Sequence, residues 1–295
     1  MEAIKKNYQL DFIGIGSSKS GSSWVSACLL EHPQINIPKE KSLFFFNTDY
    51  GNQYVKDNWS NWSKGFEWYL SRLPPVEKNK IRGEFGISYL HDPIAYKRIK
   101  KVFPNTKILV SLRNPVEMVY SLYWYNAATV EAKVPSTFEK AVEKGLFINR
   151  GKYFSHIKKF YSVFSKENVH IIIFDDIKEK PEKVVQNLYR FLNVNQEFKP
   201  GVLRKKVYSS IGNRSVLLKN ICYTVFSWIN KFKITWLRDF LLENPIFYRV
   251  YSAVNVKSKK YPPLDDETKN MLREYYKKDI EKLEKLIGIE LCKWK

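Results

Sequence analysis

Short runs of β-branched and apolar residues alternate along the chain with segments in which apolar residues recur at helical spacing. Three such runs are FIGIG at 12–16, KILVSLR at 107–113 and VHIIIFDD at 169–176. The helix-like segments SWVSACLLEHP, NPVEMVYSLYWYN and KPEKVVQNLYRFLNV follow them in turn. This alternation predicts an α/β fold, with a central parallel sheet flanked by helices. Such sheets bind ligands at the carboxyl ends of their strands, so we expect a site in the loops there.

Three further segments have the apolar spacing of helices: PSTFEKAVEKGLF, GKYFSHIKKFYSVF and LDDETKNMLREYYKKDIEKLEKLIG. In the first, Ser136 is the expected N-cap, because Glu139 follows three residues later as in a capping box. No internal repeat, low-complexity tract or linker rich in Pro, Gly and Ser divides the chain. We therefore predict a single domain over residues 1–295, with residues 200–262 as a variable helical excursion.

The most apolar stretch is VLLKNICYTVFSWINKFKITWLRDFLL at 216–242, and five charged residues interrupt it. It falls short of the roughly 18 uninterrupted apolar residues of a transmembrane helix. Two interpretations stay open. One is a helix pair buried on one face, as amphipathic helices more often are. The other is an interfacial helix, which predicts peripheral membrane contact through residues 216–251.

The composition is that of a folded protein with an anionic partner. Of the 295 residues, 44% are hydrophobic and 16% aromatic, which excludes a disordered chain. Fifty Lys and Arg against thirty Asp and Glu give a formal charge of +20. This charge attracts nucleic acid, an anionic membrane, an acidic glycan or a nucleotide. No RNP, zinc-finger or basic-zipper pattern is present, so we do not expect a nucleic-acid partner.

The cysteines and the N-terminal residues give no sign of export. Cys28, Cys222 and Cys292 lie far apart, without a CxxC pair or a spacing typical of zinc, so we predict neither a disulfide framework nor a metal site. MEAIKKNYQLDFIGIG lacks a long apolar segment followed by a small-residue cleavage site. We therefore expect a cytoplasmic protein, and the sequence does not fix its oligomeric state.

The first apolar run ends in GSSKSGSS at 16–23, which has the composition of a phosphate-binding loop. Glycine and serine between a strand and a helix let the backbone present several N–H groups to an anion at the helix N-terminus. Helix capping alone explains the serines but not Lys19. The nucleoside-triphosphate loop does not match, because Ile13 and Ser18 stand at its two glycines. The dinucleotide fingerprint fails as well, because Lys19 replaces its third glycine.

Two segments resemble motifs of a known family. IGIGSSKSGSSWVSACLLEHPQI resembles the 5′-phosphosulfate loop of sulfotransferases that use 3′-phosphoadenosine 5′-phosphosulfate (PAPS), and SLRNPVEMVYSLYWY resembles their 3′-phosphate segment. IPKEKSLFFFN, RGEFGISYL, RGKYFSHIKKF, IIIFDDIKEKPEKVVQNLYRFLNV and LREYYKKDIEKLEKLIG with Trp294 are similar too, in the family's order. The resemblance covers most of the chain except residues 216–255. It implies a PAPS-dependent sulfotransferase of the carbohydrate, heparan-sulfate type that requires no metal.

The resemblance also implies a nucleotide site built from separate segments. The phosphosulfate contacts would come from the first loop, namely Lys19, Ser20, Gly21, Ser22, Ser23 and Trp24. Arg113 and Ser121 would hold the 3′-phosphate, and Arg214 in SSIGNRS would lie in a later loop over the nucleotide. Because Arg113 ends a strand and Ser121 lies about two turns into the next helix, both can face one anion. Lys19 is the catalytic candidate that stabilises charge on the departing phosphate.

The sequence leaves the general base open. In carbohydrate-type relatives the base is a Glu in a Lys-Glu-x-x-Phe-Phe pattern; here Lys41 matches the Lys, but Ser42 stands at the Glu. Glu84 is one candidate, because its apolar neighbours would raise its pKa toward neutrality. An ion-pair role for Glu84 with a Lys or Arg is the alternative. Glu40, two residues from Ser42, is a second candidate, and His91 is a third.

The aromatic segment FFFNTDYGNQYVKDNWSNWSKGFEWYL favours a glycan or glycolipid acceptor, because aromatic rings stack on sugars, although the same rings also suit a core. The transferred group would reach a hydroxyl or an amine. The alternative function is a P-loop-type kinase, favoured if VHIIIFDD is a strand that ends in magnesium-binding aspartates. A non-enzymatic module that binds nucleic acid or membrane through its charge is the third hypothesis.

Overall fold

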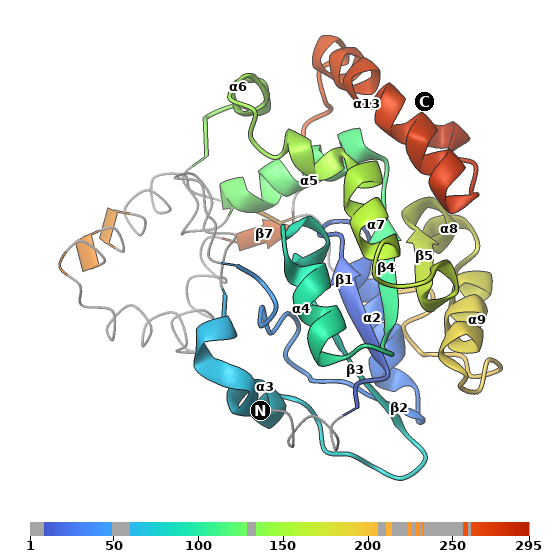
Figure 1. Cartoon of the computed structure of the whole chain (residues 1–295). Coiled ribbons are helices and arrows are strands. Elements are labelled where there is room, and N and C mark those ends of the chain that lie inside the picture. Colours follow the sequence, from blue (N-terminus) through green and yellow to red (C-terminus); the bar gives the residue numbers. More distant parts are fainter. Residues whose placement is uncertain are drawn as a thin grey trace.

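A computed structural model describes residues 9–48, 60–128, 134–205, 211–213, 224–225, 228–229, 232, 256–258 and 261–294. Its centre is a five-stranded parallel sheet in the order β2-β3-β1-β4-β5 (Figure 1). The strands are β1 (Phe12–Gly16), β2 (Ile35–Asn36), β3 (Ile81–Phe85), β4 (Lys107–Leu112) and β5 (Val169–Ile173). The predicted α/β fold is confirmed.

Helices cover both faces of the sheet (Figure 1). The α-helices are α2 (Ser22–Glu31), α3 (Gly65–Arg72), α4 (Ala95–Val102), α5 (Pro115–Ala128), α6 (Phe138–Glu143), α7 (Tyr153–Tyr161), α8 (Phe174–Glu179), α9 (Pro181–Leu192) and α13 (Asp266–Ile287). Short 3-10 turns are η1 (Trp62–Lys64), η2 (Tyr89–His91), η3 (Ile148–Gly151), η4 (Lys166–Asn168) and η5 (Cys292–Trp294).

The sheet has an apolar core on each face, because successive residues of a strand point to opposite sides. On β1, Ile13 and Ile15 join one core and Phe12 joins the other. The first core includes residues of α4, α5, α7 and α13, and the second includes residues of α2, α8 and α9. Because β1 lies between β3 and β4, the loops that follow β1 and β4 leave the same edge of the sheet side by side.

The strand expected at 169–176 is shorter than predicted. β5 ends at Ile173, and the next residue begins α8. Asp175 and Asp176 therefore lie in the first turn of a helix, where the helix dipole favours carboxylates. Asp175 accepts a hydrogen bond from Trp294 Nε1 at 2.9 Å and pairs with Lys178 at 2.7 Å. The interpretation of these aspartates as the end of a strand, which favoured a kinase, is wrong.

Two other expectations concern the periphery of the fold. Thr137, not Ser136, is the N-cap of α6, because the Thr137 side chain accepts a hydrogen bond from Lys140 N–H. Most of the excursion expected at 200–262 lies outside the described residues. Its described part contains an antiparallel strand pair, β6 (Ile211–Asn213) with β7 (Val256–Ser258), and β6 contacts α5. The helical character of the rest, and the extent of the single domain, stay predictions.

Candidate functional site

The predicted phosphate loop connects β1 to the N-terminus of α2. Ser17 N–H donates to Ser111 O on β4 at 2.8 Å, which ties the loop to the neighbouring strand. Gly21 caps α2 with a φ of 84°, in the left-handed region. A Cβ at Gly21 would lie 2.8 Å from Ile177 Cδ1 and 2.9 Å from Phe174 Cδ2. Both the backbone conformation and the packing of α8 therefore require glycine here.

Lys19 lies in this loop, also with a left-handed backbone, at a φ of 59°. Its Nζ is 4.6 Å from the centroid of the Tyr125 ring on α5. Burial, and secondly the charge of Arg113, lower the pKa of Lys19 to about 8. A buried ammonium in this setting is stabilised when an anion lies beside it.

Lys41 reaches the same loop from the segment after β2. Its Nζ donates to Ser22 Oγ and to Ser23 Oγ, both at 3.0 Å. Burial, and secondly the charge of Lys19, lower the pKa of Lys41 to about 7. Among the residues placed by the structure, no salt bridge joins either lysine to a carboxylate. The sequence carries one signal for Lys41, its match to the Lys of the family's Lys-Glu-x-x-Phe-Phe pattern, and this match alone does not predict its contact with the loop.

Arg113 follows β4, and its guanidinium also contacts the loop. Its Nη1 donates to Lys19 O at 3.3 Å, and its Nη2 and Nε donate to Glu117 Oε2 at 2.9 and 3.1 Å. The guanidinium carbon lies 4.7 Å from the centroid of the Phe174 ring. Ser121 is buried two turns along α5. The structure thus joins Arg113 to the phosphate loop, and the contact of Ser121 with an anion stays a prediction.

Tyr153 of α7 contacts both the segment that carries Arg113 and the phosphate loop. It is fully buried, and its hydroxyl donates to Arg113 O at 3.0 Å. Burial raises the pKa of Tyr153 far above its usual value, and hydrogen bonds with Ser20 and Ser17 oppose that rise. Sequence reasoning missed this residue, because in RGKYFSHIKKF it has the spacing of any core position of an amphipathic helix.

Two other predicted nucleotide residues, Trp24 and Ser20, donate side-chain hydrogen bonds to backbone carbonyls. Trp24 is 6% exposed, and its Nε1 donates to Leu203 O at 3.3 Å, so its indole packs in the core around α2. Ser20 is buried, and its Oγ donates to Ser18 O at 3.3 Å. Arg214 lies outside the described residues. Their contacts with a nucleotide stay predictions.

Glu84 lies on β3 and is 1% exposed. Its Oε1 accepts hydrogen bonds from the hydroxyls of Tyr69 at 3.0 Å and Tyr89 at 3.2 Å, and its Oε2 is buried without a hydrogen-bond partner among the described residues. Burial raises the pKa of Glu84 to about 7, in spite of the two hydrogen bonds. The pKa of Glu84 is therefore shifted in the predicted direction, and its hydrogen-bond partners are tyrosines rather than the Lys or Arg of the alternative interpretation.

The other two candidate bases differ in exposure. Glu40 is exposed at the bend just before Lys41. Ser42, at the position of the family's Glu, is buried, and its backbone N–H donates to Phe85 O at 3.1 Å. His91 is buried with its ring centroid 4.9 Å from that of His156, and burial and then His156 hold its pKa well below the usual value. Of the three candidates, Glu40 is the one that faces solvent.

The aromatic segment expected to stack on sugar is mostly core where it is described. Phe45, Phe46 and Tyr69 are at most 2% exposed, and the rings of Phe45 and Tyr69 stack at 4.4 Å between centroids. For these three residues the core alternative is correct. Tyr125, which the sequence did not single out, is 42% exposed beside Lys19. It gives the site an accessible aromatic face.

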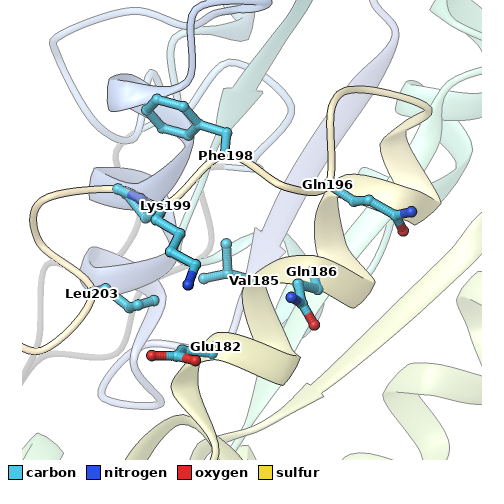
Figure 2. Close-up of a pocket in the computed structure, with 8 residues that line it drawn as sticks. Glu182, Val185, Gln186, Gln196, Phe198, Lys199 and Leu203 are labelled. Carbon is cyan, nitrogen blue, oxygen red and sulfur yellow. The ribbon is translucent and has the colours of Figure 1, made fainter.

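A small surface pocket lies between α9 and residues 196–203 (Figure 2). Its lining includes Glu182, Val185, Phe198 and Lys199. None of the described residues predicted for the nucleotide lines it, so it is not the candidate site. Within the ranges that the structure describes, no cluster of three His, Cys, Asp or Glu residues is placed to hold a metal, and no helix has the length and apolarity to cross a membrane.

The fold and the loop define an α/β protein with a candidate anion site at a helix N-terminus, where Lys19, Lys41 and Arg113 lie. The sulfotransferase domain model matches residues 9–284, and the chain belongs to this family. The predicted resemblance is confirmed, and with it a sulfotransferase as the class of enzyme.

Relatives agree with this assignment. The chain is 25% identical to bifunctional heparan sulfate N-deacetylase/N-sulfotransferase 4 of Mus musculus, over 96% of this chain and 31% of that protein. It is 26% identical to the membrane-associated sulfotransferase kil1 of Dictyostelium discoideum, over 96% of this chain and 66% of that protein. The chain therefore spans about a third of the length of the first relative.

A solved structure has the same fold. The crystal structure of a sulfotransferase from Alicyclobacillus acidocaldarius superposes with a TM-score of 0.68, at 21% identity, and the match covers 97% of this chain and 99% of that one. This likeness extends beyond the sheet to nearly the whole chain.

Proposed function

We propose that this chain transfers a sulfuryl group from PAPS to a hydroxyl or amine of a carbohydrate acceptor. The observation that carries the proposal is the pair Lys19 and Lys41 at the N-terminus of α2, two partly buried lysines that each have a cation beside them: Arg113 beside Lys19, and Lys19 beside Lys41. A phosphosulfate group brings negative charge to the place where these two positive charges repel, so its binding is favoured. The donors also fit the group, since the hydroxyls of Ser22 and Ser23 and the first N–H groups of α2 suit its oxygens.

The reaction breaks the bond between sulfur and the bridging oxygen of the 5′-phosphate and forms one to the acceptor oxygen or nitrogen. Negative charge grows on the departing phosphate, and the ammonium of Lys19 stabilises it. Arg113 and Ser121 hold the 3′-phosphate and so fix the position of the nucleotide. The acceptor proton passes to a base, for which the exposed Glu40 and the buried Glu84 are the two candidates.

Two observations support a glycan or glycolipid acceptor. The mouse relative is named for N-sulfation of heparan sulfate. Tyr125 is 42% exposed and lies beside Lys19, at a position where an aromatic residue can contact a sugar next to the sulfuryl group. The formal charge of +20 attracts acidic glycans over a longer range.

Peripheral membrane contact through residues 216–251 belongs to the same proposal. In the described part of this stretch, Val225, Trp228 and Phe232 are 49%, 61% and 61% exposed, at spacings that place them on one face of a helix. The cytoplasmic location stays a prediction. Cosedimentation with vesicles containing anionic lipid tests the contact: we expect Trp228→Ala to weaken it, and equal sedimentation of both proteins would contradict it.

Transfer of ³⁵S from labelled PAPS tests the function directly. The acceptor should be offered in matched forms, one glucosamine-containing glycan with free amines and the same glycan with acetylated amines, together with a neutral glycolipid. We expect the wild type to transfer label to at least one acceptor, and we expect Lys19→Ala to lose this transfer. Label in the free-amine form alone would show N-sulfation. If none of a broad set of glycans and glycolipids gains label while the nucleotide binds, the carbohydrate acceptor is wrong.

A further inference from the structure

Lys41 contacts the phosphate loop through two serine hydroxyls. Its Nζ donates to Ser22 Oγ and Ser23 Oγ, both at 3.0 Å, in the first turn of α2. A hydroxyl has one proton to donate. Because both oxygens accept a bond from Lys41, the Ser22 and Ser23 protons point away from Lys41 and are available to another acceptor. The lysine therefore sets the direction in which two loop donors can act.

Burial, and secondly the ammonium of Lys19, disfavour the charge on Lys41, whereas other groups packed around it favour that charge. The loop contributes the ammonium of Lys19, α2 contributes the two hydroxyls, and β3 contributes the Phe85 ring, whose centroid is 5.5 Å from Nζ. Arg113 adds a further cation beside Lys19. The two hydroxyl oxygens and the ring face favour an ammonium, but neither serine nor phenylalanine carries negative charge at neutral pH, and no carboxylate among the described residues forms a salt bridge with Lys41. Without an anion in the site, its pKa is about 7.

We propose that Lys41 is a proton-switched positioning residue of the phosphosulfate site: it takes up a proton from solvent as the 5′-phosphate group binds, and it then directs the Ser22 and Ser23 hydroxyls at that group. The inference rests on the proposed function, because it assigns a role within the same site. The proton stays on Lys41 during sulfuryl transfer and returns to solvent when the product nucleotide leaves. The charge on Lys41 therefore stabilises the departing phosphate at the moment when its negative charge is greatest.

The proposal predicts a measurable proton uptake. At pH 7.5 a group with a pKa near 7 is roughly three-quarters neutral, and one with a pKa near 8 is roughly one-quarter neutral. A bound polyanion raises both pKa values, so Lys41 and Lys19 together gain about one proton, most of it on Lys41. The second pKa of a phosphate is about 6, so at pH 7.5 the ligand contributes little.

Calorimetric titration with adenosine 3′,5′-bisphosphate, at pH 7.5 in two buffers of different ionisation enthalpy, measures this uptake. We expect about one proton for the wild type and roughly a quarter of a proton for Lys41→Met. Lys39→Met, two residues away and exposed, is the matched control and should behave as the wild type. The wild-type affinity should also fall as the pH rises from 6.5 to 9, and Lys41→Met should show a shallower fall.

Three outcomes would overturn parts of this account, and they can be told apart. A wild type that binds without proton uptake, or with an affinity independent of pH, contradicts the switch and leaves the proposed function standing. Equal uptake by the wild type and Lys41→Met assigns the proton to another group. A wild type that does not bind the bisphosphate at all contradicts the proposed function itself. If Lys41→Met does not fold, the proton uptake of the wild type and the pH dependence of its affinity still test the switch.

Discussion

Lys19 lies in the phosphate loop, and Lys41 and Arg113 reach that loop from two other segments through hydrogen bonds. Arg113 donates to Lys19 O, and Lys41 donates to Ser22 and Ser23. No carboxylate among the described residues forms a salt bridge with Lys19 or Lys41. Keeping these two lysines charged therefore lowers the stability of the folded protein. At the residue scale, the site is therefore organised for an anion rather than for stability.

Lys19→Ala should lower kcat by on the order of 10² to 10³, the usual cost of losing one preorganised donor to developing charge. The measurement is turnover with labelled PAPS at saturating acceptor. Lys39→Ala serves as the control, because Lys39 is an exposed lysine nearby. Near-normal turnover of Lys19→Ala would show that another group stabilises the departing phosphate.

Glu84 should make the protein less stable as the pH rises. Its pKa is about 7 in the folded state against a reference value of 4.5, so the folded state binds more protons between these values, and stability falls as the pH rises from about 4.5 to about 7. The loss is on the order of 3 kcal/mol. Urea unfolding at pH 4.5 and 8 should show a smaller difference for Glu84→Gln than for the wild type.

Glu40→Gln, at an exposed position, should keep the pH dependence of stability of the wild type. An unchanged dependence in Glu84→Gln would mean that Glu84 does not carry the effect. The kcat values of these two variants also separate the candidate bases, since loss of a general base costs roughly 10² or more. If neither variant loses more than about tenfold, neither Glu is the base.

At the scale of elements, the turn from β1 into α2 was predictable, and the end of β5 was not. FIGIG followed by GSSKSGSS changes abruptly from apolar to small and polar residues, and the structure ends β1 at that change. VHIIIFDD has no such change, because Phe174 continues the apolar run although it already begins α8. The pattern of apolar residues along the sequence does not locate the end of β5, because Phe174 and Ile177 pack beside Gly21, which is distant in the sequence.

Gly21→Ala tests that packing. The substitution places a Cβ at left-handed φ and within 3 Å of Ile177 and Phe174, so we expect a loss of stability of at least 1–2 kcal/mol and weaker binding of adenosine 3′,5′-bisphosphate. Gly145→Ala is the matched control. Gly145 also has a positive φ, of 69°, but no atom of the described part of the chain lies within 4 Å of the added Cβ. Equal destabilisation by both variants would show that backbone strain alone accounts for the effect.

At the scale of the whole molecule, sheet order brings the site together. Because β1 and β4 are neighbours, the loop with Lys19 and the segment with Arg113 meet, although they are far apart in sequence. The sequence predicted these two segments through the family resemblance. It could not place Lys41 and Tyr153, because their contacts depend on the path of the chain after β2 and on the packing of α7.

The central claim, a PAPS-type nucleotide site in a sulfotransferase, is tested most directly by thermal unfolding of the chain with adenosine 3′,5′-bisphosphate and, separately, with ATP plus magnesium. At about 100 times its dissociation constant a ligand stabilises the folded state by about 2.7 kcal/mol, which raises the melting temperature visibly. We expect a rise with the bisphosphate that a chelator does not change. A melting temperature that rises with ATP plus magnesium but not with the bisphosphate would contradict the assignment of a PAPS-type site.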